Sequence, residues 1–288
     1  MYKKAIKENS KYLLPFIEGI KYFGSDEIEH ALGTMIVLNK NGEVLTCKHI
    51  AERFVENDFL SKRYKSIIND SKTMSKEEIK KKYNIDDDSV VLSNISLPFE
   101  VPEKVDIQIK MHEYLDLALI RFKGINIECD SYPKFSKTMP MQGQSLCKLG
   151  YAFPEYDYFE YSKAKNNIVM KESITANFPL FPMDGIVTRL MGDEKGIISY
   201  FETSTPGIRG QSGGPVFSPE GVVYGMQSMT KHIDLNFDIN SSVRRGATSK
   251  KVVYTPFINL GVEVSSPKII EFLKENNVKF ESVGEKNE

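Results

Sequence analysis

Short apolar runs separated by turn residues are the feature of this chain that most restricts its fold. Between Leu32 and Cys47, the sequence LGTMIVLNKNGEVLTC contains two such runs around Asn-Lys-Asn-Gly, which is typical of a β-hairpin. Further short runs occupy residues 89–97, 105–110, 116–122, 144–153, 185–191, 196–203, 214–218, 221–229 and 252–261. Strand candidates at this spacing predict an all-β barrel or sandwich rather than a parallel α/β sheet.

Three segments depart from the strand pattern. Residues 59–83 are highly charged and lack Gly and Pro, and a serine-to-glutamate capping pattern predicts a short helix over Lys76–Tyr83. This insertion is either a solvated surface segment or an element that docks a partner or gates a site. Pro at the first helical position predicts a C-terminal helix over Ser266–Asn277. Residues 232–251 are polar and irregular, and they predict a long mobile loop between two strands.

Composition argues against several classes of protein. The chain has 38 basic and 39 acidic residues and a formal net charge of −1, so its charge favours neither nucleic acid nor an anionic membrane as a partner. No window approaches the roughly 18 apolar residues of a membrane span, and the first residues lack a signal-peptide pattern. Cys47, Cys129 and Cys147 are too few and too widely spaced for a disulfide framework or metal site. We therefore expect a cytoplasmic protein without cofactor or metal.

The segment Gly207–Phe217, GIRGQSGGPVF, has the composition of a loop that holds a nucleophilic serine. A serine hydroxyl needs a neighbouring base and backbone N–H groups directed at the developing oxyanion. Gly210 and Ser212 would supply those two N–H groups. Gly213 and Gly214 would leave room for a bound chain.

A serine nucleophile requires a histidine, and the chain has four. His49 lies in VLTCKHIAERF, where an apolar strand passes into a helical turn at the lip of a barrel. His49 is therefore either the base or a structural histidine. His30 is predicted to have a surface role, and His112 and His232 are predicted to be solvated.

The acid of such a site would be Asp116, in YLDLALIRF. An unpaired carboxylate in this apolar strand would be costly to bury, so a partner is expected. The alternative is an ordinary turn residue at a strand end. The order His49, Asp116, Ser212 favours a catalytic triad, because it is the order of chymotrypsin-type triads and not of subtilisins or α/β-hydrolases.

These segments resemble those of the trypsin-like (chymotrypsin-fold) serine peptidases. LTCKHIA, YLDLALIRF and GQSGGPVFSPEGVVYGMQS resemble the histidine, aspartate and serine segments, and LGTMIVLN resembles the strand before the histidine. The motifs are similar in style to those of bacterial intracellular peptidases of the high-temperature-requirement type. The resemblance covers about Leu32 to Val264 and implies two six-stranded antiparallel β-barrels with the triad in the cleft between them.

The resemblance also implies a division of the chain. We expect an N-terminal extension over 1–26 and a first barrel over 27–135, which carries His49 and Asp116 and includes the insertion. The second barrel would cover 136–264 and carry Ser212, followed by a helix and tail over 265–288.

Gln211 departs from the family pattern. Digestive members have an aspartate before the nucleophile, which receives the new N-terminus after zymogen cleavage. The glutamine makes activation by N-terminal trimming unexpected. It favours control by loop ordering or by a regulatory protein partner.

The primary specificity pocket also differs from that of tryptic members. Pro206 stands six residues before Ser212, where tryptic enzymes carry an acid, and no acidic residue lies between Ser204 and Gln211. Thr205, Pro206, Gln227 and Ser228 would line a neutral pocket that takes an apolar or small polar side chain. Cleavage after Lys or Arg is not expected.

The sequence therefore predicts a serine endopeptidase that acts on protein or peptide substrates. The main alternative is a catalytically inactive protease homologue that serves as a protein-binding module. A third possibility is a hydrolase of small esters or amides, since the same triad could perform that reaction.

Overall fold

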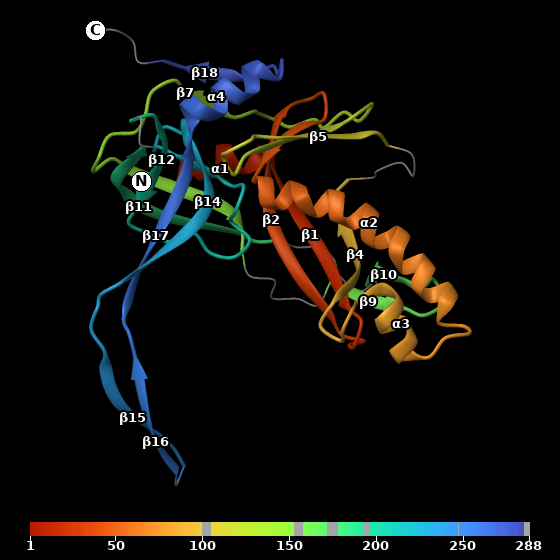
Figure 1. Ribbon diagram of the computed structural model, residues 1–288. Coiled ribbons are helices and arrows are strands. Elements are labelled where there is room, and N and C mark those ends of the chain that lie inside the picture. The colour runs from red at the N-terminus through yellow and green to blue at the C-terminus, as the bar shows by residue number, and fades with distance from the viewer. Residues whose placement is uncertain (100–104, 153–157, 172–177, 193–195, 247, 285–288) are drawn as a thin grey trace.

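Two curved β-sheets form the body of the protein (Figure 1). The computed structural model describes residues 1–99, 105–152, 158–171, 178–192, 196–246 and 248–284.

The first sheet has six antiparallel strands and is open along one side. Its order is β4 (Val90–Ser96), β1 (Leu13–Tyr22), β2 (Ile28–Asn39), β3 (Glu43–Thr46), β6 (Ala118–Phe122) and β5 (Ile107–Met111). Strand β1 falls within the segment expected to be an extension, yet it pairs with β2 on one side and β4 on the other. The sheet therefore begins at Leu13 rather than at residue 27.

The second sheet closes into a six-stranded barrel. The order is β13 (Pro215–Phe217), β8 (Ser145–Tyr151), β11 (Leu180–Gly192), β12 (Ile198–Thr203), β17 (Phe257–Ser265) and β14 (Val223–Asp234), and β13 pairs with β14 to close it. The short strands β7 (Lys134–Ser136) and β18 (Glu281–Val283) add to it in parallel. The predicted all-β, two-barrel fold class is confirmed, with the second barrel closed and the first open.

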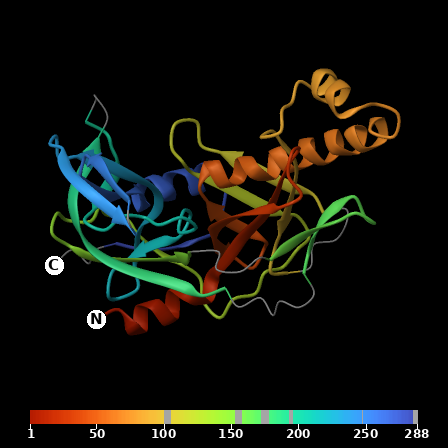
Figure 2. The same ribbon diagram turned by 90° about the horizontal axis from the view of Figure 1, so that it is seen from below.

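Helices flank the two sheets. After α1 (Lys3–Asn9) and η1 (Ser10–Tyr12), the predicted insertion helix and C-terminal helix are present as α3 (Lys76–Tyr83) and α4 (Ser266–Glu275). A further helix of 23 residues, α2 (Lys48–Asp70), was not predicted from the sequence. It overlaps the insertion only over residues 59–70 and runs along the outside of the first sheet (Figure 2). Its sequence lacks Gly and Pro, and the side chains that it buries recur at helical spacing: Ile50, Ala51, Leu60, Tyr64 and Ile67.

A small hairpin from the second half of the chain packs against the first sheet. It consists of β9 (Phe159–Ser162) and β10 (Asn167–Met170). The Asn94 amide donates to the Ile168 carbonyl at 2.7 Å, and the Tyr64 hydroxyl of α2 donates to the Tyr161 hydroxyl at 2.8 Å. Residues 158–170 thus belong spatially to the first sheet, although the sequence division places them in the second barrel.

A second hairpin replaces the mobile loop that was predicted over 232–251. Strand β14 continues to Asp234, and β15 (Ile239–Arg245) pairs with β16 (Thr248–Tyr254) in a two-stranded sheet that projects from the body (Figure 1). The loop prediction was wrong because most of the apolar residues among the polar ones gather on one face of the ribbon. These are Ile239, Val243, Val252 and Tyr254.

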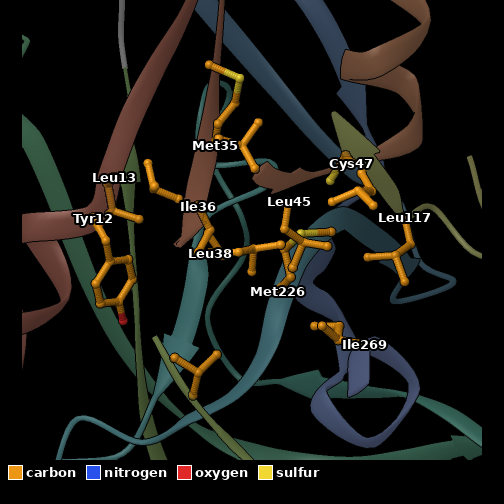
Figure 3. Close-up of a cluster of buried hydrophobic side chains, with 14 of the residues drawn as sticks. Tyr12, Leu13, Met35, Ile36, Leu38, Leu45, Cys47, Leu117, Met226 and Ile269 are labelled. Atoms are coloured by element: carbon orange, nitrogen blue, oxygen red, sulfur yellow. The ribbon is translucent and has the colours of Figure 1, made fainter. Parts of the chain in front are cut away.

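Buried apolar side chains from both sheets form one continuous core (Figure 3). Cys47, two residues before His49, and Leu117, directly after Asp116, are both fully buried in it. These two anchors fix the backbone on either side of the predicted acid–base pair. Among the described residues, no helix has both the length and the apolarity that crossing a bilayer requires.

Candidate active site

His49 lies in the first turn of α2, and Asp116, in the bend before β6, caps that helix. The N-cap residue, Cys47, is extended and makes no side-chain capping bond. Instead, Asp116 Oδ1 accepts a hydrogen bond from the His49 backbone N–H at 3.1 Å. A carboxylate at a helix N-terminus satisfies a free N–H group and interacts favourably with the helix dipole. The fold of the helix therefore places the histidine beside the acid.

The His49 ring and the Asp116 carboxylate form a close pair. His49 Nδ1 is 3.1 Å from Asp116 Oδ1 and 3.0 Å from Oδ2. Asp116 Oδ2 also accepts from the Ser228 hydroxyl at 2.6 Å, and the Asp116 N–H donates to the Tyr200 hydroxyl at 3.3 Å. The expected partner of Asp116 is thus present, and the sequence analysis missed Tyr200.

The carboxylate is held in its ionised form. Burial opposes ionisation of Asp116, but the hydrogen bonds from His49 and Ser228 outweigh burial and lower the pKa of the carboxyl below its ordinary value. An ionised Asp116 accepts from the Nδ1–H tautomer of His49. That tautomer leaves Nε2 free to act as a base.

Ser212 lies in the loop before β13 of the second barrel. Its side chain is half-buried, and its hydroxyl donates to the Ser228 carbonyl at 3.2 Å. Within the described part of the chain it forms no hydrogen bond to His49. Ser228 thus contacts both Asp116 and Ser212, the first through its hydroxyl and the second through its carbonyl.

Thr34, on strand β2 of the first sheet, anchors the loop that carries Ser212. The Thr34 N–H donates to the Ser212 carbonyl at 2.9 Å, and its hydroxyl donates to the Gly210 carbonyl at 2.9 Å. The same hydroxyl accepts from the Tyr151 N–H at 3.0 Å. Thr34 belongs to the LGTMIVLN segment, which resembles the family's strand before the histidine. Its role in anchoring the loop was not predicted from the sequence.

Three glycines of the loop allow close backbone contacts. Gly210 (φ +98°) and Gly213 (φ +85°) adopt left-handed conformations, and an added Cβ would collide with the carbonyl oxygens of Tyr151 and Thr34, respectively. A Cβ at Gly214 would collide with the Leu149 carbonyl. Gly213 and Gly214 therefore make room for the protein's own strands, which corrects the expectation that they make room for a bound chain.

The N–H groups of Gly210 and Ser212, the expected oxyanion donors, have no acceptor among the described residues. The carbonyls of both residues are turned to Thr34.

Gln211 is fully buried, and its side-chain amide binds the protein's own backbone. Its Nε2 donates to the Phe181 carbonyl at 2.7 Å, and its Oε1 accepts from the Ile208 N–H at 3.2 Å. These bonds hold the segment before Ser212 on strand β11 without a charged partner.

The residues expected to line the specificity pocket have different surroundings. The Thr205 hydroxyl is buried and faces Gly185, whose added Cβ would lie 2.6 Å from it, while the half-buried Pro206 follows in the same segment. Gln227 is 2 % exposed and binds Lys148. Ser228 is directed to Asp116.

The other three histidines lie away from this site. His30, on β2, accepts from the Phe159 N–H at 3.2 Å and stacks on its ring, so it has a packing role at the β9–β10 hairpin. His112 Nδ1 accepts from the N–H groups of Tyr114 and Leu115 at 3.1 and 3.0 Å, which corrects the prediction that it is solvated. His232 is exposed on β14, as predicted.

One group of possible metal ligands occurs among the described residues. Single ligand atoms of Cys47, His49 and Asp116 lie within 4.8 Å of one another. Burial raises the pKa of the Cys47 thiol well above its ordinary value, and the thiol donates to the Gln227 carbonyl at 3.3 Å. Since metals bind the thiolate, these surroundings do not favour a metal centre.

Comparison with known proteins identifies the family. The family described as the trypsin-like peptidase domain matches residues 33–226, which include His49, Asp116 and Ser212. No curated protein matches the chain significantly. The match covers most of the chain and agrees with the two-barrel fold. The chain therefore belongs to the trypsin-like peptidase family.

Proposed function

We infer that this protein is a serine endopeptidase that hydrolyses peptide bonds through His49, Asp116 and Ser212. The observation that carries the inference is the convergence on Asp116, which binds the His49 ring and the Ser228 hydroxyl, while the Ser228 carbonyl accepts the Ser212 hydroxyl. His49 and Asp116 are thus in direct contact, and Ser228 connects Asp116 to Ser212. Acyl transfer requires a nucleophile, a base and an acid that orients the base, and Ser212, His49 and Asp116 can fill these roles.

In the proposed mechanism, the Ser212 side chain first rotates from the Ser228 carbonyl towards His49 Nε2. Such a rotation between staggered conformers is small, and catalytic hydrogen bonds are often absent before substrate binds. His49 then takes the hydroxyl proton as Ser212 Oγ attacks the substrate carbonyl. The bond to the leaving amine breaks as His49 returns the proton to the amine, and water releases the acyl group by the same steps.

The free N–H groups of Gly210 and Ser212 would stabilise the oxyanion during both steps. Preorganised donors of this kind contribute about 3 to 4 kcal/mol to transition-state stabilisation. Asp116 would keep His49 in the Nδ1–H tautomer and stabilise its protonated form.

A peptide substrate is favoured over a small ester by the free edge of β14. This strand pairs with β13 only as far as Met226 but continues to Asp234, paired with β17 on one side. No described strand pairs with its other edge beside Ser228. An extended peptide can add to this edge as a further strand, which would bring a backbone carbonyl to Ser212.

Regulation in this proposal does not depend on N-terminal cleavage. Gln211 binds Phe181 and Ile208 and needs no incoming amino group. The N-terminal segment also supplies β1, an interior strand of the first sheet, so its removal would disrupt that sheet. We place the control in a regulatory protein partner or a loop change that turns Ser212 to His49, in a cytoplasmic protein whose cysteines are free thiols.

The second candidate is an inactive homologue that binds proteins. The Ser212 hydroxyl bonded to Ser228 instead of His49 is the observation in its favour.

Active-site labelling distinguishes the two candidates. A fluorophosphonate probe should label the wild type but not Ser212→Ala, and labelling should be strongly reduced in His49→Ala. Asp116→Asn should lower kcat by about 10⁴-fold while leaving the fold intact. An intact-mass measurement should find the probe on the uncleaved chain. Absence of labelling would favour the binding module, and labelling only after N-terminal loss would contradict the proposed regulation.

A further inference from the structure

A buried ion pair lies inside the second barrel, close to the loop that carries Ser212 (residues 207–214). Lys148 Nζ, on β8, is 2.8 Å from Glu263 Oε1, on β17, and the two side chains are 2 % and 0 % exposed. Removing two charges from water is costly unless further polar groups satisfy them. Nζ meets this need by also binding Thr203 Oγ1, the Thr205 carbonyl and Gln227 Oε1 at 2.8, 2.8 and 2.9 Å.

Gln227 connects this pair directly to the Ser212 loop. The Gln227 carbonyl accepts from the Gly213 N–H, and its own N–H donates to the Gly214 carbonyl, both at 2.8 Å. Its side chain holds Lys148, and the next residue, Ser228, accepts the Ser212 hydroxyl. The ammonium group is therefore one side chain away from the loop that carries the nucleophile.

Two glycines leave the space that these polar groups occupy. A Cβ at Gly261 would collide with Lys148 Nζ and lie 2.6 Å from Glu263 Oε1, and a Cβ at Gly207 would collide with the Gln227 amide. The backbone around the two glycines is joined by the Gly261 N–H, which donates to the Thr205 carbonyl at 2.9 Å. The polar groups thus fill the region between the Thr205 segment and strands β14 and β17, where the primary specificity site was expected.

The charges of this region cancel. A lysine ammonium has three N–H groups, and four oxygen atoms surround Nζ, so Lys148 has no hydrogen free for a ligand. Glu263 Oε2 has no hydrogen-bond partner among the described residues. A substrate side chain entering here meets no net charge, and one carboxylate oxygen remains as an acceptor.

We propose that the Lys148–Glu263 pair forms the base of the primary specificity site and restricts the residue before the scissile bond to uncharged side chains. The proposal rests on the proposed peptidase function and names its substrate class. A charged substrate side chain of either sign would lose its hydration at this neutral pair and find no unpaired opposite charge in return. Loss of either partner leaves a single charge that favours a substrate side chain of the opposite sign.

The test uses peptides that differ only in the residue before the scissile bond. The wild type should cleave after uncharged residues at least about tenfold faster than after Lys, Arg, Asp or Glu, measured as relative kcat/KM. Lys148→Met should shift this ratio towards Lys and Arg by about tenfold, and Glu263→Gln should shift it towards Asp and Glu by a similar factor. The double variant should regain the preference for uncharged residues.

Opposite shifts in the two single variants cannot come from a general loss of stability, which would lower all rates together. Equal loss for all peptides, or a wild type that prefers a charged residue, would overturn the proposal. If a single variant does not fold, the preference for uncharged over charged residues is compared between the wild type and the double variant. Both should show it, and its absence in the wild type would overturn the proposal. Fluorophosphonate labelling of Ser212 in each protein separates this outcome from failure of the peptidase function, since labelling does not depend on the peptide series.

Discussion

The loop that carries Ser212 (residues 207–214) and the β15–β16 hairpin differ in how strongly the rest of the protein holds them. Thr34 and Gln211 bind the backbone around Ser212, and Gly213 is pressed against Thr34. The strands of the hairpin pair only with each other among the described strands, and they leave Val243, Val253 and Tyr254 about half exposed. Isolated two-stranded ribbons are marginally stable in water. Buried hydrogen bonds therefore hold the backbone around Ser212 in place, whereas no described residue in the body of the protein gives the β15–β16 hairpin such support.

The largest effect should come from Gly213→Ala. The substitution forces an L-residue to φ +85° and drives its Cβ into the Thr34 carbonyl, so the free energy of unfolding should fall by about 3 kcal/mol or more. Gly143→Ala is the matched control, because Gly143 has φ +83° with no atom within 4 Å of the added Cβ, and should cost about 1 kcal/mol. Denaturant unfolding measures both. Equal losses would mean that close packing of the loop contributes nothing.

Thr34→Val should have the next largest effect. It keeps the shape of the side chain but leaves the Gly210 carbonyl and the Tyr151 N–H without their partner, at a cost of about 2 kcal/mol. Labelling of Ser212 by the fluorophosphonate should slow as the loop loosens. Thr34→Ser retains the hydroxyl and should label at nearly the wild-type rate. A valine variant that labels normally would show that the anchor does not position Ser212.

His112 provides a pH-dependent test of the loop before Asp116. Burial lowers the pKa of His112 below its ordinary value of 6.5. Nδ1 of the neutral ring accepts two backbone N–H groups. Between the folded and unfolded pKa values, the unfolded chain binds more protons, so stability falls as the pH drops below about 6.5. His112→Ala should cost about 1 kcal/mol at pH 7.5.

The control for this prediction is His112→Asn, whose carbonyl oxygen can accept in place of Nδ1 without titrating. Melting temperatures at pH 7.5 and 5.5 should differ less for the asparagine variant than for the wild type. An unchanged difference would assign the acid sensitivity to other groups.

The smallest effect should follow replacement of residues 236–255 by a short turn. The hairpin buries little surface against the body, so the free energy of unfolding should change by less than about 0.5 kcal/mol. Fluorophosphonate labelling should also be unchanged. A large loss of stability or labelling would show that the hairpin supports the second barrel and would remove the contrast with the loop that carries Ser212.

The sequence predicted the helix ends and turns that are determined by residues close together in the chain. The capping box of α3 and the proline that begins α4 lie within a few residues of the turns they specify. The order of His49, Asp116 and Ser212 and the all-β pattern were also readable, since each segment carries its own strand or turn signal.

Features that depend on distant partners could not be predicted. Strand β1 contains Pro15 and Gly19, which weaken a strand pattern, and it is fixed by pairing with β2 and β4. Lys148 interrupts an apolar strand, and its partner Glu263 lies 115 residues away. The roles of Thr34 and Ser228 likewise arise only when the two sheets meet.

The capping of α2 by Asp116 couples the orientation of the His49 ring to the winding of the first helical turn. The carboxylate that orients the His49 ring also binds the backbone N–H of the same residue. If the first turn of α2 unwinds, the ring loses its orientation together with the helix. The fraction of molecules in which His49 and Asp116 form this pair therefore cannot exceed the fraction in which this turn is wound, and fraying of the helix end lowers both.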